Sequence, residues 1–280
     1  MGSNDVPPEG CPWWLVPVHM GLLGVGLLLW DATYILMIRR AMATKSYSMP
    51  LLGLAINLSW ELVYLFYVVE MPIEAAGFLF WLLLDVGLVY TTVRFAPEDW
   101  KNTSPWVGRN IAWILALMTA VACFGNYSFA AWWLAEPGMG SGDKAGKWWC
   151  GQEGHDTTEL AFWSAGFAQV VASAGSIAML IVRGHSGGTG YAIWFCRAMG
   201  TLFGLVLCNV LMWWYWPEAH GFIVSPFAVF LWATAIACDV AYPLVLWQVR
   251  RLEQVLPDGR VIAGGSLASS PKAFGVKKGQ

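Results

Sequence analysis

Residues 14–38 read WLVPVHMGLLGVGLLLWDATYILMI, an almost unbroken apolar run that contains one acidic residue, Asp31. About 20 consecutive apolar residues are enough for a helix to cross a lipid bilayer. The whole chain has the same character, since 58% of its 280 residues are hydrophobic, only 12% are charged, and the mean hydropathy is +0.54. Soluble domains carry roughly 25% charged residues, so this composition predicts an integral membrane protein.

Six more apolar runs of membrane-spanning length follow this one. The seven predicted spans are Trp14–Ile38, Met49–Val69, Ala75–Phe95, Asn110–Leu134, Leu160–Val182, Tyr191–Trp216 and Phe222–Trp247. They fill more than half of the chain and leave short loops, so we expect an all-α fold, a seven-transmembrane helical bundle over residues 1–250. Residues 251–280 are expected to form a tail that is disordered from Pro257 onward, because this segment is rich in Gly and Ser.

The basic residues predict the orientation of the bundle. Most Lys and Arg follow the first, third and fifth spans or lie in the C-terminal tail, whereas the other loops hold only Lys144 and Lys147 and are rich in acids. The positive-inside rule therefore predicts a lumenal N-terminus and a cytosolic C-terminus. The tail ends in Lys277-Lys278-Gly279-Gln280, which resembles the dilysine retrieval signal, so we expect the endoplasmic reticulum membrane.

Two further features leave alternatives open. Cys11 and Cys150 both lie on the predicted lumenal side, where they either form a disulfide or remain free thiols. Short matches between spans one to three and spans five to seven suggest a three-plus-one-plus-three (3+1+3) repeat, in which Asp85 corresponds to Asp239 and Asn57 to Asn209. Such a repeat would arrange these helices around one cavity.

Four acidic residues lie inside the predicted spans, where burial in hydrocarbon is costly. They are Asp31, Glu61, Asp85 and Asp239, and Arg197 is the only basic residue predicted to share their environment. An acid in such a position either serves the function or holds neighbouring helices together. Four acids with a single base favour a polar cavity inside the bundle.

Helical spacing groups two of these acids with aromatic residues. Asn57, Glu61 and Tyr64 share one face of the second span, and Asp239 and Tyr242 share one face of the last. At 1.5 Å per residue, Glu61 lies about 18 Å and Asp239 about 12 Å from the cytosolic ends of their spans. These similar depths predict that the two acids open onto one pocket.

The chemistry of such a pocket narrows the function. Burial keeps a carboxyl group protonated, so that it can donate a proton in an apolar site. Aromatic faces stabilise a carbocation, and the chain has 19 Trp, more than two interfacial belts require. This combination suits the protonation and cyclisation of a lipophilic polyene, although an intramembrane proton relay would use the same acids.

Several signatures are absent from the sequence. It has no Asp-Asp-x-x-Asp motif for a Mg²⁺-bound diphosphate, no P-loop, no Gly-rich dinucleotide turn and no His-x-x-x-His metal spacing. We therefore expect neither a metal nor another cofactor. The net charge of −2 also argues against a nucleic-acid partner.

One stretch carries a specific resemblance. Lys45-Ser46-Tyr47-Ser48-Met49-Pro50, followed by Asn57-Leu58-Ser59-Trp60-Glu61-Leu62-Val63-Tyr64, resembles the second-span signature of the fungal integral-membrane terpene cyclases of meroterpenoid and indole-diterpene pathways, the pyripyropene-cyclase type. Leu62 replaces the Phe that this family usually has. The resemblance continues at Asp31 with Tyr34, at Asp85 followed by Tyr90-Thr91-Thr92, and at Asp239, and it covers the chain to about residue 250.

The resemblance implies a mechanism. The family's proposed catalytic acids correspond to Glu61 and Asp239, and they protonate a terminal epoxide, or an alkene, on a prenyl chain linked to an aromatic or indole head group. The implied partner is a lipophilic epoxy-prenyl small molecule in the lipid bilayer, with no obligate protein partner. Which acid donates the proton stays open, because coupled carboxyls titrate as a pair. The expected substrate-binding residues are Asn57, Trp60, Tyr64, Asp31, Tyr34, Asp85, Tyr90, Asn209, Trp213 and Tyr242.

Two other functions remain as alternatives. A small proton-coupled seven-helix transporter would use Asp85 and Asp239 as its relay, and it should have broken helices that give access to both membrane faces. A cyclase should instead have a blind, aromatic pocket. A structural membrane protein is disfavoured by the four buried acids.

Overall fold

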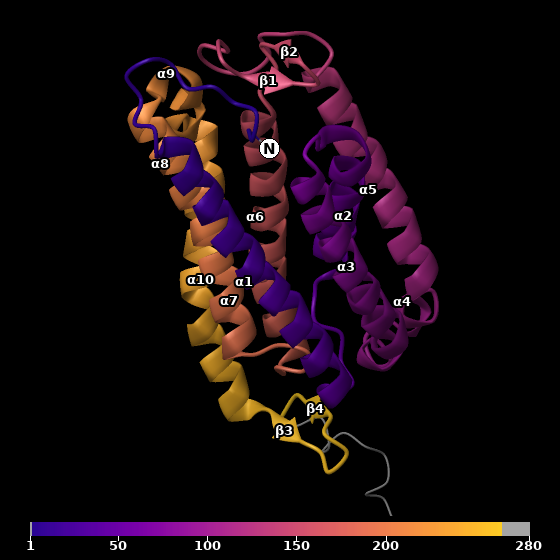
Figure 1. Ribbon diagram of the computed structural model, residues 1–280. Coiled ribbons are helices and arrows are strands. Elements are labelled where there is room, and N and C mark those ends of the chain that lie inside the picture. The colour runs from indigo at the N-terminus through magenta and orange to yellow at the C-terminus, as the bar shows by residue number, and fades with distance from the viewer. Residues whose placement is uncertain (1, 265–280) are drawn as a thin grey trace, which may run out of the picture.

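The computed structural model describes residues 2–264 and shows a bundle of long helices (Figure 1). Within these residues seven helices are long and apolar enough to cross a membrane, which confirms the predicted all-α, seven-span fold. Their bounds are α1 Leu15–Thr44, α2 Leu51–Val63 with its π-helical extension η1 Tyr64–Val68, α3 Pro72–Asp99, α5 Ile111–Trp133, α6 Thr157–Arg183, α7 Tyr191–Thr201 continued by the π-helical η2 Leu202–Leu207 and by α8 Cys208–Tyr215, and α10 Pro226–Leu252.

Short elements lie at the ends of the long helices. They are α4 Pro105–Arg109, α9 Pro217–His220, the 3₁₀ helix η3 Gly221–Val224, β1 Trp148–Trp149 paired with β2 Gln152–Glu153, and β3 Gln254–Val255 paired with β4 Val261–Ile262. The seventh long helix begins at Pro226 rather than at Phe222, because the Ser225 hydroxyl caps it by accepting a hydrogen bond from the backbone N–H of Ala228. Pro226 suits the first helical position, where no N–H donor is needed.

The bundle is built from helices that pack along their lengths. α1 packs against α7 and α3, α2 against α5 and α6, and α6 against α10. The backbones of α1 and η2 touch at Gly26, where an added Cβ would lie only 2.5 Å from the Cα atom of Gly204. Small residues permit this close approach, so the first and sixth spans are held together by backbone contact.

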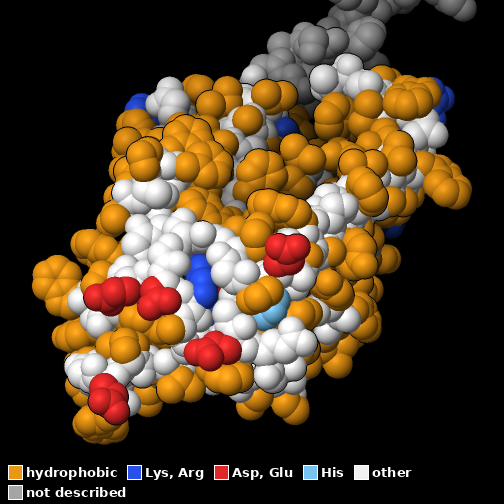
Figure 2. Space-filling view, turned by 90° about the horizontal axis from the view of Figure 1, so that it is seen from above, with side chains coloured by type: hydrophobic (Ala, Val, Ile, Leu, Met, Phe, Trp, Pro, Cys, Tyr) orange, Lys and Arg blue, Asp and Glu red, His pale blue; other side chains and the backbone are white. Residues whose placement is uncertain are grey.

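The two ends of the bundle carry different loops. The N-terminal segment, β1–β2 and α9 lie together at one end, and α4 and β3–β4 lie at the other (Figure 1). Figure 2 looks onto the first of these, which we call the acidic end, and shows acidic side chains spread over its surface among apolar ones. The loops assigned to one side by their charges therefore do lie together. Which side of the membrane the acidic end faces stays a prediction, as does the 3+1+3 repeat.

The two lysines of the acidic end are buried. Lys147 has no exposed surface, and its Nζ atom lies 2.7 Å from Asp5 Oδ2 and 2.9 Å from His220 Nε2. We call the surrounding group of charged and titratable side chains the buried charge cluster; its members are Asp5, Lys144, Lys147, Asp156, Glu159 and His220. The cluster joins the N-terminal segment to the loop before α6, to the start of α6 and to α9.

Burial and charge act together on the titration of this cluster. Burial opposes the ionisation of Asp156, but attraction to Lys147 and Lys144 outweighs it and lowers the pKa of Asp156 to about 2. The pKa of His220 is lowered to about 3, mainly by burial and also by repulsion from the adjacent Lys147 ammonium. His220 Nδ1 faces the carbonyl oxygen of Trp216, which only accepts, so Nδ1 carries the proton and Nε2 accepts from Lys147.

The chain after α10 differs from the expectation of a tail disordered from Pro257. Residues 254–262 form the β3–β4 hairpin, in which Leu256 N donates to Arg260 O at 2.8 Å and Gly259 takes the positive φ of 86° that the turn requires. The Arg260 guanidinium contacts Asp258 and reaches Glu98 at the end of α3. Composition alone missed these local contacts. The dilysine sequence at Lys277-Lys278 lies outside the described residues.

The structure resolves the alternative for the two cysteines of the acidic end. Within residues 2–264 both Cys11 and Cys150 are free thiols. The Cys11 thiol donates to the carbonyl oxygen of Tyr215, and the backbone N–H of Cys150 donates to Glu70. Each is therefore held by a partner other than a second cysteine.

Replacing His220 should make the free energy of unfolding depend less on pH under acidic conditions. The unfolded histidine has a pKa of about 6.5, so between pH 6.5 and about 3 the unfolded chain binds a proton that the folded chain excludes. The free energy of unfolding should thus fall with falling pH, by at most about 1.4 kcal/mol per unit from this group. Thermal unfolding in detergent between pH 7.5 and 4.5 should show a smaller decline for His220→Gln than for the wild type. Parallel curves would contradict this assignment.

Candidate active site

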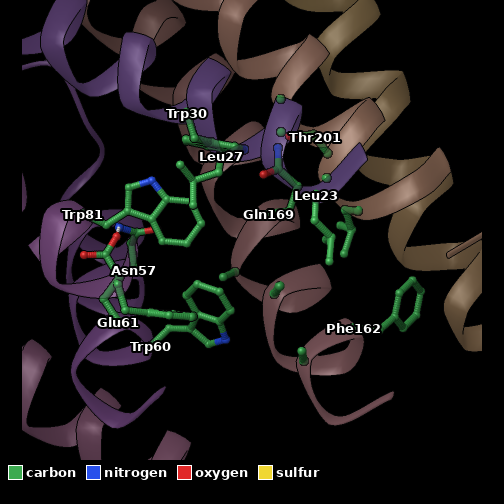
Figure 3. A pocket seen from close by; sticks show the side chains of 18 of the residues that line it. Leu23, Leu27, Trp30, Asn57, Trp60, Glu61, Trp81, Phe162, Gln169 and Thr201 are labelled. Atoms are coloured by element: carbon green, nitrogen blue, oxygen red, sulfur yellow. Dashed lines mark hydrogen bonds between the residues drawn. The ribbon is translucent and has the colours of Figure 1, made fainter. Parts of the chain in front are cut away.

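A cavity of about 350 Å³ lies between α1, α2, α3, α6 and the α7–α8 span (Figure 3). Most of its wall is apolar, and the aromatic part consists of Trp30, Trp60, Phe78, Trp81 and Phe162, together with Tyr34. The polar wall includes Asn57, Glu61, Gln169, Thr201 and Asn209. This volume lies within the range of small-molecule pockets, and its lining is typical of a site for a lipophilic ligand.

Glu61 lines this cavity, as does Glu74, and a small network holds the Glu61 carboxyl group. Its side chain is buried, and the Tyr34 hydroxyl lies 3.1 Å from its Oε1 atom. Asn57 Nδ2 lies 2.9 Å from Glu61 Oε1, 2.6 Å from the Tyr34 hydroxyl and 3.0 Å from Asp85 Oδ2. An amide NH₂ has two protons, so these three acceptors share two donors. Asn57 therefore bridges the two carboxyl groups.

The Glu61 and Asp85 carboxyls are both buried, and both accept a hydrogen bond from the Asn57 amide, at 2.9 Å and 3.0 Å. Two carboxylates brought this close by one neutral amide repel each other and are costly to bury, which favours a proton on one of them. The hydrogen bonds to this pair come from Tyr34 and Asn57, which are both neutral, and within residues 2–264 neither acid forms an ion pair. The pair is thus built to hold a proton, and Glu61 is the member that faces the cavity.

The aromatic wall beside Glu61 is fixed by its own contacts. The centroid of the Trp60 ring lies 4.7 Å from that of Tyr64, 5.0 Å from that of Phe78 and 6.1 Å from that of Trp81. Trp60 Nε1 donates to the Ser164 hydroxyl at 2.9 Å, and the Tyr64 hydroxyl bonds the same oxygen at 2.6 Å. These bonds satisfy the polar edges of the rings and leave the Trp60 face to the cavity, where it can stabilise a cation.

Asp239 lies in a different environment. Its Oδ1 atom is 2.6 Å from Arg197 NH2, and the Arg197 guanidinium lies over the Tyr242 ring, 5.1 Å from the centroid. Asp239 is not among the residues that line the cavity. The two acids therefore do not open onto one pocket as their depths had predicted, because α7 places a cation directly against Asp239.

The other predicted binding residues divide in the same way. Tyr34, Asn57, Trp60 and Asn209 line the cavity with Glu61, whereas Asp31, Tyr64, Asp85, Tyr90, Trp213 and Tyr242 do not. Tyr64 and Asp85 lie directly behind the wall, and the exposed Tyr90 lies on the outer surface of α3. Trp213 packs in the apolar cluster around Phe162 and Phe222.

Gln169 is a cavity residue that the sequence analysis missed. It lies on α6, is 7% exposed, and donates from Nε2 to the Ser173 hydroxyl at 2.9 Å. The signal that could have found it is the polar series Gln169, Ser173 and Ser176, whose spacing of four and three residues places them on one face of an otherwise apolar span.

The N-terminal segment crosses the cavity at the acidic end. The Ser3 hydroxyl donates to Glu74 on α3, and the backbone N–H of Gly2 donates to the Thr157 hydroxyl at the start of α6. Glu74 and Thr158 both line the cavity. Gly2 has a positive φ of 72°, and a Cβ there would lie 2.3 Å from the Thr158 hydroxyl oxygen, so this position requires glycine.

Comparison with known proteins identifies the family. Residues 3–252 match the family model of the Pyr4-like transmembrane terpene cyclases. The chain belongs to this family. It is 38% identical to the terpene cyclase ascF of Acremonium egyptiacum over 94% of this chain and 93% of that one. It is 34% identical to the terpene cyclase dpchB of Colletotrichum higginsianum (strain IMI 349063), over 87% and 90% of the two chains.

A third relative agrees. The Pyr4-family terpene cyclase mfmH of Annulohypoxylon moriforme is 30% identical over 87% of this chain and 91% of its own. No solved structure matches the chain. The protein is therefore a multi-pass membrane terpene cyclase of the kind found in fungal secondary metabolism, an enzyme that acts on a lipophilic terpenoid substrate. Family membership decides against the transporter and the structural protein.

Removing Arg197 should destabilise the cyclase strongly. Breaking a buried ion pair by deleting one partner costs about 3–5 kcal/mol, because the other charge stays buried without compensation. Arg197→Met should lower the free energy of unfolding by this amount, and adding Asp239→Leu should recover most of it. Arg109→Met, at an exposed arginine, is the control and should change little. Detergent unfolding in which the single and double variants are equally unstable would contradict the pairing.

Proposed function

We propose that the cyclase uses Glu61 to protonate the terminal epoxide, or a terminal alkene, of a prenylated aromatic or indole substrate. The carboxyl proton moves to the epoxide oxygen, the bond from that oxygen to the more substituted carbon breaks, and the resulting cation is attacked by the next alkene of the chain. The final cation loses a proton or is captured by a nucleophile within the substrate. The reaction so written needs no redox partner.

The observation that carries this proposal is the pair of buried carboxyls, Glu61 and Asp85, which Asn57 bridges at the wall of an aromatic cavity. A proton held in an apolar site is a strong Brønsted acid when a basic oxygen is placed against it. Asp85 has no exposed surface and lies behind Glu61. Asp85 is thus suited to share the proton that the pair regains when the final cation loses its own.

The cavity wall supports the later steps. Trp60, Trp81 and Trp30 surround the space that Glu61 faces, so a migrating cation is never far from an aromatic face. The mostly apolar lining also disfavours water, which would end the cyclisation early. The sequence lacks the Asp-rich motif that would hold a diphosphate, which favours initiation by protonation over ionisation of a diphosphate.

Asp239 carries a different task in this proposal. An arginine guanidinium is always charged, so its short contact with Asp239 favours the carboxylate, which has no proton to donate. We therefore assign the proton donation to Glu61 and a supporting role to Asp239. The lumenal N-terminus, the endoplasmic reticulum location and the independence from cofactors stay predictions.

Substitution of Glu61 by Gln should remove the proton donor and keep the shape of the cavity. Glu61→Gln keeps the hydrogen bonds from Tyr34 and Asn57 but has no acidic proton, so turnover should fall by about 10²–10⁴-fold. The assay is microsomal conversion of epoxidised farnesyl- and geranylgeranyl-aryl substrates, followed by mass spectrometry.

Asp31→Asn is the matched control for this assay. Asp31 is also an acid buried in a membrane-spanning helix, but it does not line the cavity. Its substitution should leave turnover within about threefold of the wild type, the scatter expected for a change outside the site. Wild-type turnover by Glu61→Gln would overturn the proposed donor.

A further inference from the structure

The buried pair of Asp239 and Arg197 is connected to the cavity by two side chains of α6. Ser173 Oγ donates to Asp239 Oδ1 at 3.3 Å, and Gln169 Nε2 donates to Ser173 Oγ at 2.9 Å. Ser173 has no exposed surface, whereas Gln169 lines the cavity. The chain of contacts therefore runs from the ion pair, through Ser173, to the cavity wall.

The charge of Asp239 fixes the direction of every bond in this chain. A carboxylate held by Arg197 can only accept hydrogen bonds, so the Ser173 hydroxyl proton must point to Asp239. The Ser173 oxygen then has only its lone pairs left, so it must accept from Gln169. The Gln169 amide consequently turns its NH₂ group to Ser173, which leaves its carbonyl oxygen, Oε1, on the other side of the amide.

Gln169 and Glu61 lie on different walls of the cavity. Figure 3 shows Glu61 with Trp60 and Trp81 on one side, from α2 and α3, and Gln169 with Thr201 on the other, from α6 and the sixth span. In the proposed reaction the proton comes from the wall that carries Glu61. The positive charge that this transfer creates then lies between that wall and the wall that carries Gln169.

We propose that Asp239 is a positioning residue that acts through Ser173 to present the Gln169 carbonyl oxygen to the cation formed during cyclisation. This inference rests on the proposed function, since it needs a cationic intermediate in the cavity. A fixed carbonyl dipole stabilises positive charge strongly in an apolar site, because it needs no reorganisation when the charge appears. Gln169 touches the reacting chain, whereas Ser173 and Asp239 hold Gln169 in place.

The chain offers a matched pair of serines for the test. Ser173 and Ser176 are both buried on α6 and both bond the Asp239–Arg197 pair, Ser173 through Asp239 and Ser176 through Arg197 NH1 at 2.7 Å. Ser173 is hydrogen-bonded to Gln169, whereas within residues 2–264 the partners of the Ser176 hydroxyl are Arg197 and the carbonyl oxygen of Ala172. A role that merely stabilises the ion pair would therefore make the two serines equivalent.

The decisive experiment measures binding, so that it does not depend on proton transfer. The probe is a farnesyl-linked tertiary amine that is protonated at neutral pH, compared with its neutral carbon isostere, as an analogue of the carbocation. All proteins carry Glu61→Gln, which removes the proposed proton donor as a partner for the ammonium, and Glu74, the other acid of the cavity wall, is the same in every variant. The detergent-solubilised protein should bind the ammonium about tenfold more tightly than the isostere, and this preference should persist in Ser176→Ala.

Ser173→Ala and Gln169→Leu should both lose this preference while binding the neutral isostere as before. Equal preference in the two serine variants, retention of the preference in Gln169→Leu, or no preference in the Glu61→Gln parent would each overturn the inference. Melting temperatures of all variants show whether each protein is folded, and the isostere shows whether its cavity is intact.

A second readout uses the enzyme with its natural Glu61 and an epoxidised farnesyl-aryl substrate. Ser173→Ala should lower kcat about tenfold with KM nearly unchanged, and should release more incompletely cyclised products, because the cation is less stabilised. Ser176→Ala should match the wild type. If the proposed function is wrong, Glu61→Gln turns over the substrate fully. The binding result can still be interpreted in that case, because it does not depend on turnover.

Discussion

Two carboxyl groups buried in the hydrocarbon region without a cation impose the main constraint on this molecule. Glu61 and Asp85 are taken out of water, which costs several kcal/mol for an isolated polar group. The structure reduces this cost by surrounding the two groups with the neutral donors Tyr34 and Asn57, and two neighbouring buried acids favour a form in which one keeps its proton. The same arrangement that makes burial tolerable leaves a proton at the wall of the cavity. Stability and chemistry therefore depend on one hydrogen-bonded pair.

Asp239 shows the opposite solution to the same problem. Asp239 is also buried, but a guanidinium compensates its charge directly. It is therefore suited to be a fixed anion and not a proton donor. The buried charge cluster repeats this second solution at the acidic end, where Lys144 and Lys147 neutralise the nearby acids. The bundle thus separates acids that store a proton from acids that orient neighbours. This separation explains how one chain carries many acids in a mostly apolar bundle and keeps Glu61 as the one suited to donate a proton.

The sequence predicted some of this arrangement well and some not at all. The seven spans follow from hydropathy, and Glu61 with Asn57 follows from helical spacing, because both are local properties. The sequence identified Arg197 as the base near the four buried acids, but its pairing with Asp239 was not predictable, since the two lie 42 positions apart and only packing of α7 on α10 brings them together. The burial of Lys147 was not predictable from its place in a loop, because its partner Asp5, from the N-terminal segment, reaches it only in the folded structure. Gln169 was missed because a single amide in an apolar span gives a weak signal.

The most direct measurement on the central claim is infrared spectroscopy of the protonated carboxyl group. A carboxylic acid and a carboxylate absorb at distinct frequencies, and only the acid band shifts on transfer to D₂O. Spectra of the detergent-solubilised cyclase at neutral pH should contain an acid band that is absent from Glu61→Gln and retained in Asp239→Asn. If the wild type and Glu61→Gln have the same acid bands at neutral pH, Glu61 holds no proton there and the account is contradicted.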